Sequence, residues 1–324
     1  MLNRRQLFLL TGAALMSAFS GTTMSTPVWP SRPVTVVIPY PAGGAADVVA
    51  RILTTELSQR LGQTFVAEPK PGANSNIAAD TVVKAAPDGY TLLITGPWLA
   101  INQFIETGRR WQPDDLVPVA RFAVMDNMMA VPATSSVRTI ADYVNLAKKA
   151  GDKPLQYASP GTGSTQRMAS ELFQQAAGIN LETVQYKGAP GILPDLVSGR
   201  VSMSVLAAGT MTGLVSAGNL RALATFGENR GANTRQVPTM AELGYPNVVA
   251  LSWFGLNAPA GTPQEVIKKL SDVIGEIVAS PDVQSKLLAA DAQPGYQDSQ
   301  AFADYLKQEE QRWGQVATSI KSEK

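Results

Sequence analysis

The stretch Val34–Asp47, VTVVIPYPAGGAAD, passes from an apolar segment through a proline- and glycine-rich one into a segment that favours a helix. This order predicts a strand over 34–38, a loop, and a helix over about 46–61. The first N–H groups of a helix have no partner within it, and together with the positive end of the helix dipole they suit an anion. We therefore interpret the loop as a carboxylate-binding loop. The alternative is a plain strand-to-helix turn that needs glycines.

The composition disfavours catalysis. The 324 residues include no histidine and no cysteine, so an imidazole base and a thiol nucleophile are excluded. The sequence also lacks the Gly-x-Ser-x-Gly motif of serine hydrolases, and the Val34–Asp47 stretch contains neither a dinucleotide-binding nor a P-loop motif. We expect no catalytic residue, no metal and no cofactor. An enzyme would have to use Asp, Glu, Lys or Tyr alone as general acids and bases.

The charged residues are balanced and dispersed. Lys and Arg total 27, against 26 for Asp and Glu, and the basic residues are spread along the chain. This distribution does not provide the basic surface that DNA or RNA requires, so we expect no nucleic-acid partner. With 45% hydrophobic and 16% charged residues the composition is that of a globular protein, and the length favours two domains.

Residues 1–26 have the composition of an export signal. Arg4 and Arg5 precede an apolar run from Leu7 to Met16, and small residues follow. We predict that this signal peptide directs the chain to the periplasm and is then removed. The paired arginines also resemble a twin-arginine signal, although ordinary secretory signals carry basic residues at the same place. No later run reaches the roughly 20 apolar residues of a membrane helix.

Beyond residue 33, strand-like and helix-like patterns alternate, which is typical of an α/β protein. We predict a first domain from 27–127 together with 250–324, and a second from 128–249. The expected strands are 34–38, 64–68, 90–95, 116–125, 128–132, 155–159, 182–187, 201–206, 220–226 and 253–256. The expected helices are 46–61, 76–86, 139–150, 166–177, 193–198, 263–279 and 299–319.

A second loop of the same kind lies in the second predicted domain. Ala158–Thr165, ASPGTGST, connects an expected strand to an amphipathic helix. Its hydroxyl side chains and the first amides of the helix are suited to donate several hydrogen bonds to a carboxylate, directly or through water. A Ser or Thr N-cap preceded by a flexible turn is the alternative interpretation.

Two aromatic residues are further candidates. Tyr186, followed by Lys187, stands at the end of an expected strand and is suited to form a pocket wall. Trp98 follows the end of another strand, where open α/β sheets bind ligands, and it could form an aromatic floor or belong to the core. Lys187 is more simply interpreted as an exposed side chain.

The sequence resembles the Bug-type substrate-binding proteins, the extracytoplasmic components of tripartite tricarboxylate transporters. The resemblance extends along nearly the whole chain after the export signal. The segments that carry it are Trp29–Pro33, Pro39–Asp47, Pro71–Ala73, Ala85–Leu93, Tyr157–Phe173, Tyr186–Gly188, Leu220–Ala224, Pro238–Glu242, Trp253–Leu256 and Pro259–Pro263.

The resemblance implies an α/β fold of two lobes, a type II-like periplasmic binding protein in which each lobe is a mostly parallel sheet flanked by helices. It further implies that one loop from each lobe holds a carboxylate of the ligand, partly through ordered water. Fixed N–H and O–H donors would replace the hydration shell of the carboxylate. We expect a monomer that binds a small organic acid and docks on membrane permease subunits.

Two departures from the family pattern concern specificity. Arg167 stands where many relatives have a histidine, and it would bind a second carboxylate if it faced the cleft or be solvated on the outer helix face. Val201–Ala208 replaces a strand that contains aspartate in many relatives. Small groups there, such as Ser204 and Ala207, would admit a bulkier or less charged ligand.

The sequence thus predicts a receptor for a di- or tricarboxylate or an aromatic acid. A binding protein that signals to a membrane sensor kinase is the second hypothesis, and an enzyme is the third. The predicted ligand-binding residues are Tyr40, Ala42, Gly43, Gly44, Ala45, Ala46, Asp47, Trp98, Ser159, Gly161, Thr162, Gly163, Ser164, Thr165, Arg167, Tyr186, Ser204 and Ala207.

Overall fold

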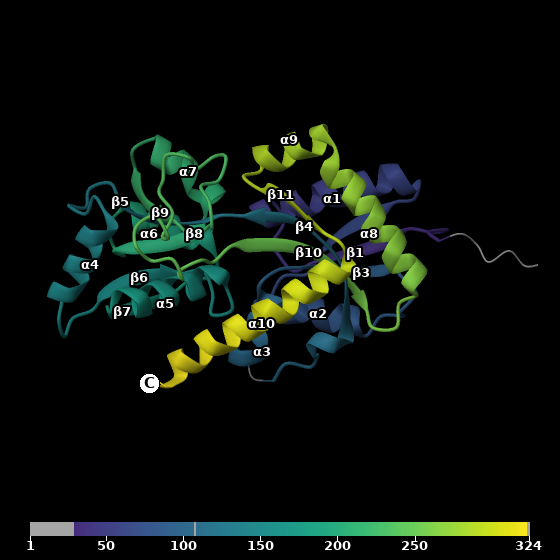
Figure 1. Cartoon of the computed structure of the whole chain (residues 1–324), viewed down its shortest axis with the longest axis horizontal. Coiled ribbons are helices and arrows are strands. Elements are labelled where there is room, and N and C mark those ends of the chain that lie inside the picture. Colours follow the sequence, from purple (N-terminus) through teal and green to yellow (C-terminus); the bar gives the residue numbers. More distant parts are fainter. Residues whose placement is uncertain (1–28, 107, 323–324) are drawn as a thin grey trace, which may run out of the picture. The chain divides into compact units, whose positions relative to one another are not determined.

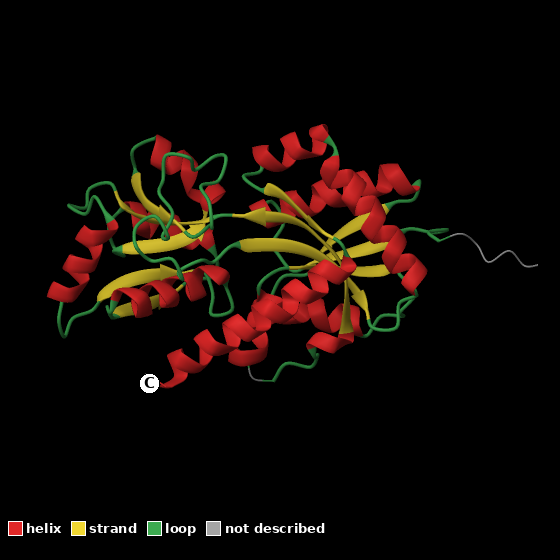
Figure 2. Cartoon of the chain, viewed as in Figure 1, coloured by secondary structure: helices red, strands yellow, loops and turns green. Residues whose placement is uncertain are grey.

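The computed structural model describes residues 29–106 and 108–322, which form two β-sheets with helices packed around them (Figures 1 and 2). Both sheets belong to one compact unit that begins at Arg32. The fold is a two-lobed α/β fold, as the sequence predicts. The expected export signal lies outside the described residues.

The sheet of the first lobe has six strands in the order β11-β4-β10-β3-β1-β2. These strands are β1 (Val34–Ile38), β2 (Phe65–Pro69), β3 (Thr91–Thr95), β4 (Leu116–Met125), β10 (Ser252–Pro259) and β11 (Gln293–Gln297). The helical segments that accompany this sheet are α1 (Ala45–Leu61), η1 (Ala73–Ser75), α2 (Asn76–Val83), α3 (Trp98–Ile105), η2 (Pro113–Asp115), α8 (Gln264–Ala279), α9 (Pro281–Ala289) and α10 (Ser299–Ser322).

The sheet of the second lobe has five strands in the order β7-β6-β8-β5-β9. Its strands are β5 (Asn127–Pro132), β6 (Leu155–Ser159), β7 (Leu181–Gln185), β8 (Met203–Ala207) and β9 (Leu220–Thr225). Its helices are α4 (Ile140–Lys149), α5 (Thr165–Ala177), α6 (Ala189–Val197) and α7 (Ala208–Ser216).

Both sheets are mixed, which corrects the expectation of mostly parallel sheets. Strands β1, β2 and β3 are parallel, whereas β10 and β11 run antiparallel to their neighbours. In the second sheet β6 pairs in parallel with β7 and β8, but β5 pairs antiparallel with β8 and β9. The antiparallel pairs arise where the chain passes between the lobes, because β4 leads directly into β5 and β10 returns from the second lobe.

The lobes also share apolar packing. One buried cluster joins residues of α5 and the second sheet with Ile101 of α3 and Trp313 of α10. Helix α10, yellow in Figure 1, packs against α3 and β4 and also contacts α5. Hydrophobic burial is the main favourable term in folding, so this cluster fixes the side of α5 that faces α3 and α10.

Neither a membrane-spanning helix nor a metal-ligating cluster of His, Cys, Asp or Glu occurs among the described residues. Within 29–106 and 108–322, no helix combines the length and the apolar character needed to span a bilayer. The same ranges contain no grouping of three or more His, Cys, Asp or Glu side chains that could hold a metal ion.

Gly255 tests the packing of α10 on β10. A Cβ added at Gly255 would lie 2.3 Å from Cζ of Phe302, a fully buried ring that stacks edge-on against Trp253. We predict that Gly255→Ala lowers the free energy of unfolding by about 1 to 3 kcal/mol, because the packed ring cannot move aside. Urea denaturation measures the change as a lower midpoint with an unchanged slope.

Gly213→Ala is the matched control, because a Cβ at this position of α7 meets no atom within 4 Å. Alanine has the higher helix propensity, so this variant should gain about 0.5 to 1 kcal/mol. Equal stability of the two variants would contradict the packing of Phe302 described above.

Candidate functional site

The loop between β1 and α1 is exposed and shaped by glycine. Pro41, Ala42, Gly43 and Gly44 are exposed, and Ala45 begins α1. Gly43 has a φ of 82°, in the left-handed region that side chains disfavour. Gly44 occupies the N-cap position and has no side chain with which to cap the helix. The first turn of α1 therefore presents N–H groups that no N-cap side chain occupies.

Asp47 braces this loop from the buried side. Asp47 is 2% exposed, and its Oδ2 accepts hydrogen bonds from the Gly43 N–H at 2.9 Å and from Nε of Arg51 at 2.8 Å. Burial acts to raise the pKa of Asp47, but the hydrogen bonds from Arg51 and Gly43 outweigh it and hold the pKa below its usual value. Asp47 is thus a charged support for the loop, and its partners are within α1 and the loop itself.

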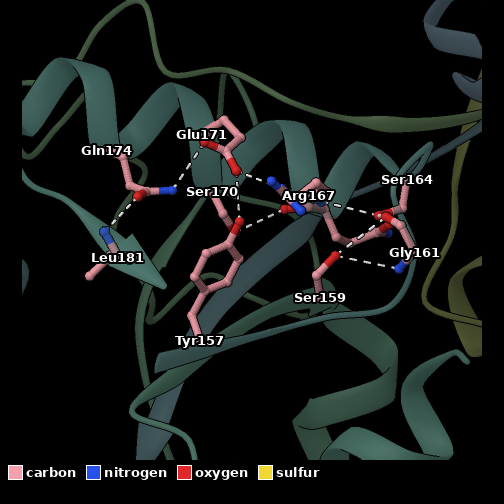
Figure 3. A network of polar contacts seen from close by, with 10 residues as sticks. Tyr157, Ser159, Gly161, Ser164, Arg167, Ser170, Glu171, Gln174 and Leu181 are labelled. Carbon is pink, nitrogen blue, oxygen red and sulfur yellow. Dashed lines mark hydrogen bonds and ion pairs between the residues drawn. The ribbon is translucent and has the colours of Figure 1, made fainter. Parts of the chain in front are cut away.

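The loop between β6 and α5 is held by its own hydroxyl groups (Figure 3). Oγ of Ser164 donates to the Gly161 carbonyl at 2.7 Å and accepts from the Arg167 N–H at 3.1 Å. Oγ of Ser159 also donates to the Gly161 carbonyl, at 3.3 Å. These two hydroxyls therefore fix the shape of the loop, and the backbone amides at the start of α5 become the main candidate donors to a ligand.

Arg167 is paired with an acid on its own helix. Its Nε lies 2.5 Å from Oε1 of Glu171, four residues further along α5. The hydroxyl of Tyr157 donates to the same oxygen at 2.8 Å, and Nε2 of Gln174 donates to Oε2 at 3.3 Å (Figure 3). Burial raises the pKa of Tyr157 above its usual value, so the hydroxyl stays protonated and donates. The guanidinium charge is neutralised within the second lobe.

Gln166 ties the start of α5 to both strands that run between the lobes. Its Nε2 donates to Oδ1 of Asn127 at 2.8 Å and to Oγ of Ser252 at 3.3 Å. Asn127 begins β5 and Ser252 begins β10, and both are buried. The sequence interpretation did not include Gln166, because no local pattern shows that α5 begins beside these strands.

The remaining aromatic candidates have partners in the protein. Trp98 begins α3, is 5% exposed and packs edge-on against Trp111 at 5.8 Å, so it belongs to the core of the first lobe. Tyr40 packs edge-on against Phe254, and burial raises the pKa of its hydroxyl. The half-buried Tyr186 donates to Oδ2 of Asp195 at 2.7 Å.

The predicted residues near β8 are parts of the second sheet. Ser204 is fully buried, and its Oγ donates to the Ala158 carbonyl of β6 at 2.9 Å. Ala207 is the last residue of β8 and pairs with Asn127. Thr165 begins α5 and is buried, whereas Ala46 lies half-buried in the first turn of α1.

The second loop contacts residues of the first lobe that the sequence did not single out, among them Asn74 and Asn102. Nδ2 of Asn74, in η1, donates to Oγ1 of Thr162 at 2.9 Å. A Cβ at Gly163 would lie 2.3 Å from Oδ1 of Asn102 in α3. Among the described residues, no hydrogen bond joins the second loop directly to the Pro39–Asp47 loop.

The sequence pattern of a known family matches residues 49–321, and this family is described as "Tripartite tricarboxylate transporter family receptor". The chain belongs to this family. Protein BugT from Bordetella pertussis is 31% identical over 318 residues, a match that covers 97% of each chain. The family assignment confirms the resemblance to Bug-type proteins and with it the class of periplasmic solute-binding proteins.

Solved structures agree with the fold of this receptor. "R. palustris Rpa4515 with adipate" superimposes with a TM-score of 0.83 at 33% identity, covering 90% of this chain and 97% of the other. MatC from Rhodopseudomonas palustris with bound malate superimposes with a TM-score of 0.78 at 27% identity, covering 89% and 99%. Both of these proteins hold an organic carboxylate.

The buried, charged side chain of Asp47 predicts a pH-dependent contribution to the free energy of unfolding. Because the pKa of Asp47 is lowered in the folded receptor, the stabilising charge is present above the unfolded pKa of about 3.9 and is lost as pH falls through the folded pKa. We predict that Asp47→Asn lowers the free energy of unfolding by about 1 to 3 kcal/mol at pH 7. The difference should shrink below about pH 4, as urea denaturation across pH measures. If the difference in the free energy of unfolding does not change with pH, the charge of Asp47 does not stabilise the loop.

The ion pair between Arg167 and Glu171 on α5 predicts a measurable coupling free energy between these two side chains. In a double-mutant cycle of Arg167→Gln and Glu171→Gln, we expect a coupling of about 1 to 3 kcal/mol, because the side chains are only 15% and 14% exposed. Urea denaturation of the three variants and the unmodified receptor measures it. The exposed pair of Lys268 and Asp272 is the control and should couple by less than about 0.5 kcal/mol. Equal coupling of the two pairs would show that Arg167 is not held by Glu171.

Proposed function

We propose that this receptor captures a small organic carboxylate between its two lobes and delivers it to the membrane permease subunits of a tripartite transporter. The observation that supports the proposal most strongly is that each lobe carries a strand that leads through a glycine-containing loop into a helix N-terminus, at Pro39–Asp47 and at Ser159–Thr165. Relatives with adipate and malate support the ligand class.

The charge distribution supports binding by backbone dipoles. Arg51 is paired with Asp47, and Arg167 is paired with Glu171, so both of these arginines beside the two loops already have an acidic partner. A carboxylate that leaves water needs replacement donors, and fixed N–H groups at a helix start supply them together with the helix dipole. We infer that α1 and α5 hold the same carboxylate, directly or through water.

The proposal includes a motion of the lobes. Ligand that contacts both loops binds the closed arrangement better than any open one, so it shifts the population toward closure.

We propose that the lobes comprise 27–127 with 250–324 and 128–249, as the sequence predicts, and that residues 1–26 direct export to the periplasm. We further propose that the receptor is a monomer. We also propose that it is not an enzyme, in keeping with a sequence that lacks histidine and cysteine.

A substitution in the first loop tests the site. Gly43 has a φ of 82° and open space around it, so Gly43→Ala changes only the backbone preference of the loop. We predict binding of adipate or malate by the unmodified receptor, and binding at least about tenfold weaker in Gly43→Ala, which corresponds to about 1.4 kcal/mol. Isothermal titration calorimetry measures both affinities.

Gly218→Ala is the matched control, because Gly218 also has a positive φ of 74° and open space around it but follows α7. It should lose similar stability and keep the affinity of the unmodified receptor. If the receptor binds none of a panel of aliphatic and aromatic mono-, di- and tricarboxylates, the proposed ligand class is wrong. If both variants bind with unchanged affinity, the first loop is not part of the site.

A further inference from the structure

The second loop, Ser159–Thr165, is held from outside its own lobe. Nδ2 of Asn74 donates to Oγ1 of Thr162 at 2.9 Å and also to the carboxylate of Glu106. The hydroxyl of Thr162 in turn reaches Glu106. A loop of the second lobe is therefore bonded to η1 and to the residue that follows α3, both in the first lobe.

The contact is so close that it requires glycine in the loop. A Cβ at Gly163 would lie 2.3 Å from Oδ1 of Asn102 and 3.5 Å from Cβ of Asn74. Asn102 is fully buried, and its Nδ2 donates to the Asn74 carbonyl at 2.6 Å, so its amide cannot turn away without breaking that bond. Any side chain at residue 163 must displace either the loop or Asn102.

The first lobe holds Asn74 in a strained conformation. Ala73, Asn74 and Ser75 have φ values of 45°, 49° and 73°, in the left-handed region that residues other than glycine rarely adopt. Bonds to both sides of Asn74 maintain this conformation. Asn102 binds the Asn74 carbonyl, and Nδ2 of Asn76 donates to the Ala73 carbonyl at 2.8 Å. Such strain persists only where the surrounding structure fixes it, and here it directs the Asn74 amide toward the second loop.

The charge and the burial of these groups indicate a support for the loop, not a ligand contact. Glu106 carries a negative charge, which would repel a carboxylate ligand, and both Asn74 and Thr162 bond to it. Asn102 is buried beneath η1 and reaches the loop at Gly163. The amides at the start of α5 follow directly in the chain, so a displacement of Gly163 moves them as well.

We propose that Asn74 and Asn102 are positioning residues of the ligand site. They fix the backbone of the Ser159–Thr165 loop, so that the amides at the start of α5 are aimed at the ligand. The affinity of the receptor therefore depends on a contact between the lobes that does not touch the ligand. This inference rests on the proposed function, but its test includes a measurement on the ligand-free protein.

Hydrogen–deuterium exchange of the ligand-free receptor, followed by mass spectrometry, tests the positioning directly. In Gly163→Ala we expect amides of residues 159–166 to exchange at least fivefold faster, because the added Cβ pushes the loop away from Asn102. Asn74→Gly should have the same effect, since glycine keeps the left-handed φ and removes only the side chain. Gly213→Ala, whose Cβ meets no atom within 4 Å, is the control and should leave this exchange unchanged.

Calorimetric titration with adipate provides the second readout. Gly163→Ala should bind at least tenfold more weakly than the unmodified receptor. Asn74→Gly adds no atom that could clash, and it should also bind at least about threefold more weakly, because the loop loses the bond between Asn74 and Thr162. A purely structural role would lower the melting temperature of both variants and leave their affinity for adipate unchanged.

The outcomes separate this inference from the proposed function. Unchanged exchange in the loop of both Gly163→Ala and Asn74→Gly would overturn the positioning role, whether or not the receptor binds adipate. If the receptor binds no organic acid while the loop exchanges faster in both variants, the proposed function fails and the positioning of the loop stands. If Gly163→Ala does not fold, Asn74→Gly alone decides.

Discussion

A strand that leads directly into a helix leaves the first N–H groups of that helix without partners, and this constraint organises both lobes. In the first lobe glycines shape the turn, and Asp47 reaches back to the Gly43 N–H, which fixes the loop without covering the helix start. In the second lobe Ser159 and Ser164 hold the turn through the Gly161 carbonyl, and Ser164 also accepts the Arg167 N–H as the N-cap of α5. In each case side chains stabilise the turn, and the remaining first amides of the helix are the candidate donors to a ligand.

Much of the fold is predictable from the sequence because hydrophobic patterning and turn residues specify local structure. The apolar run Val34–Ile38 and the segment Leu116–Met125 are strands with the predicted bounds. Helix α3 was not predicted, since its residues WLAINQFI are mostly buried and show no polar face. Helix α7 contains two glycines and two threonines, and β11 contains proline and glycine, so local propensity argues against both elements.

The two strand-to-helix loops of the candidate site were predictable from the sequence, but the side-chain partners around them were not. Arg167 and Glu171 are four residues apart on a predicted helix, a spacing that already indicates an ion pair. The roles of Asn74, Asn102 and Gln166 arise from contacts between segments distant in sequence, and no spacing reveals those. Trp98 was ambiguous, because a tryptophan after a strand end suits either a ligand floor or a core, and its packing on Trp111 depends on a turn that the sequence does not specify.

The account depends on backbone amides of α1 and α5, and not on a free arginine, to hold the carboxylate. A crystal structure of the receptor purified with its native ligand, with the ligand identified by mass spectrometry, tests this claim most directly. We predict a carboxylate oxygen within about 3 Å of N–H groups at the start of each helix, or joined to them by one water. A carboxylate bound instead to Arg167 released from Glu171, or loops that face away from the ligand, would contradict the account.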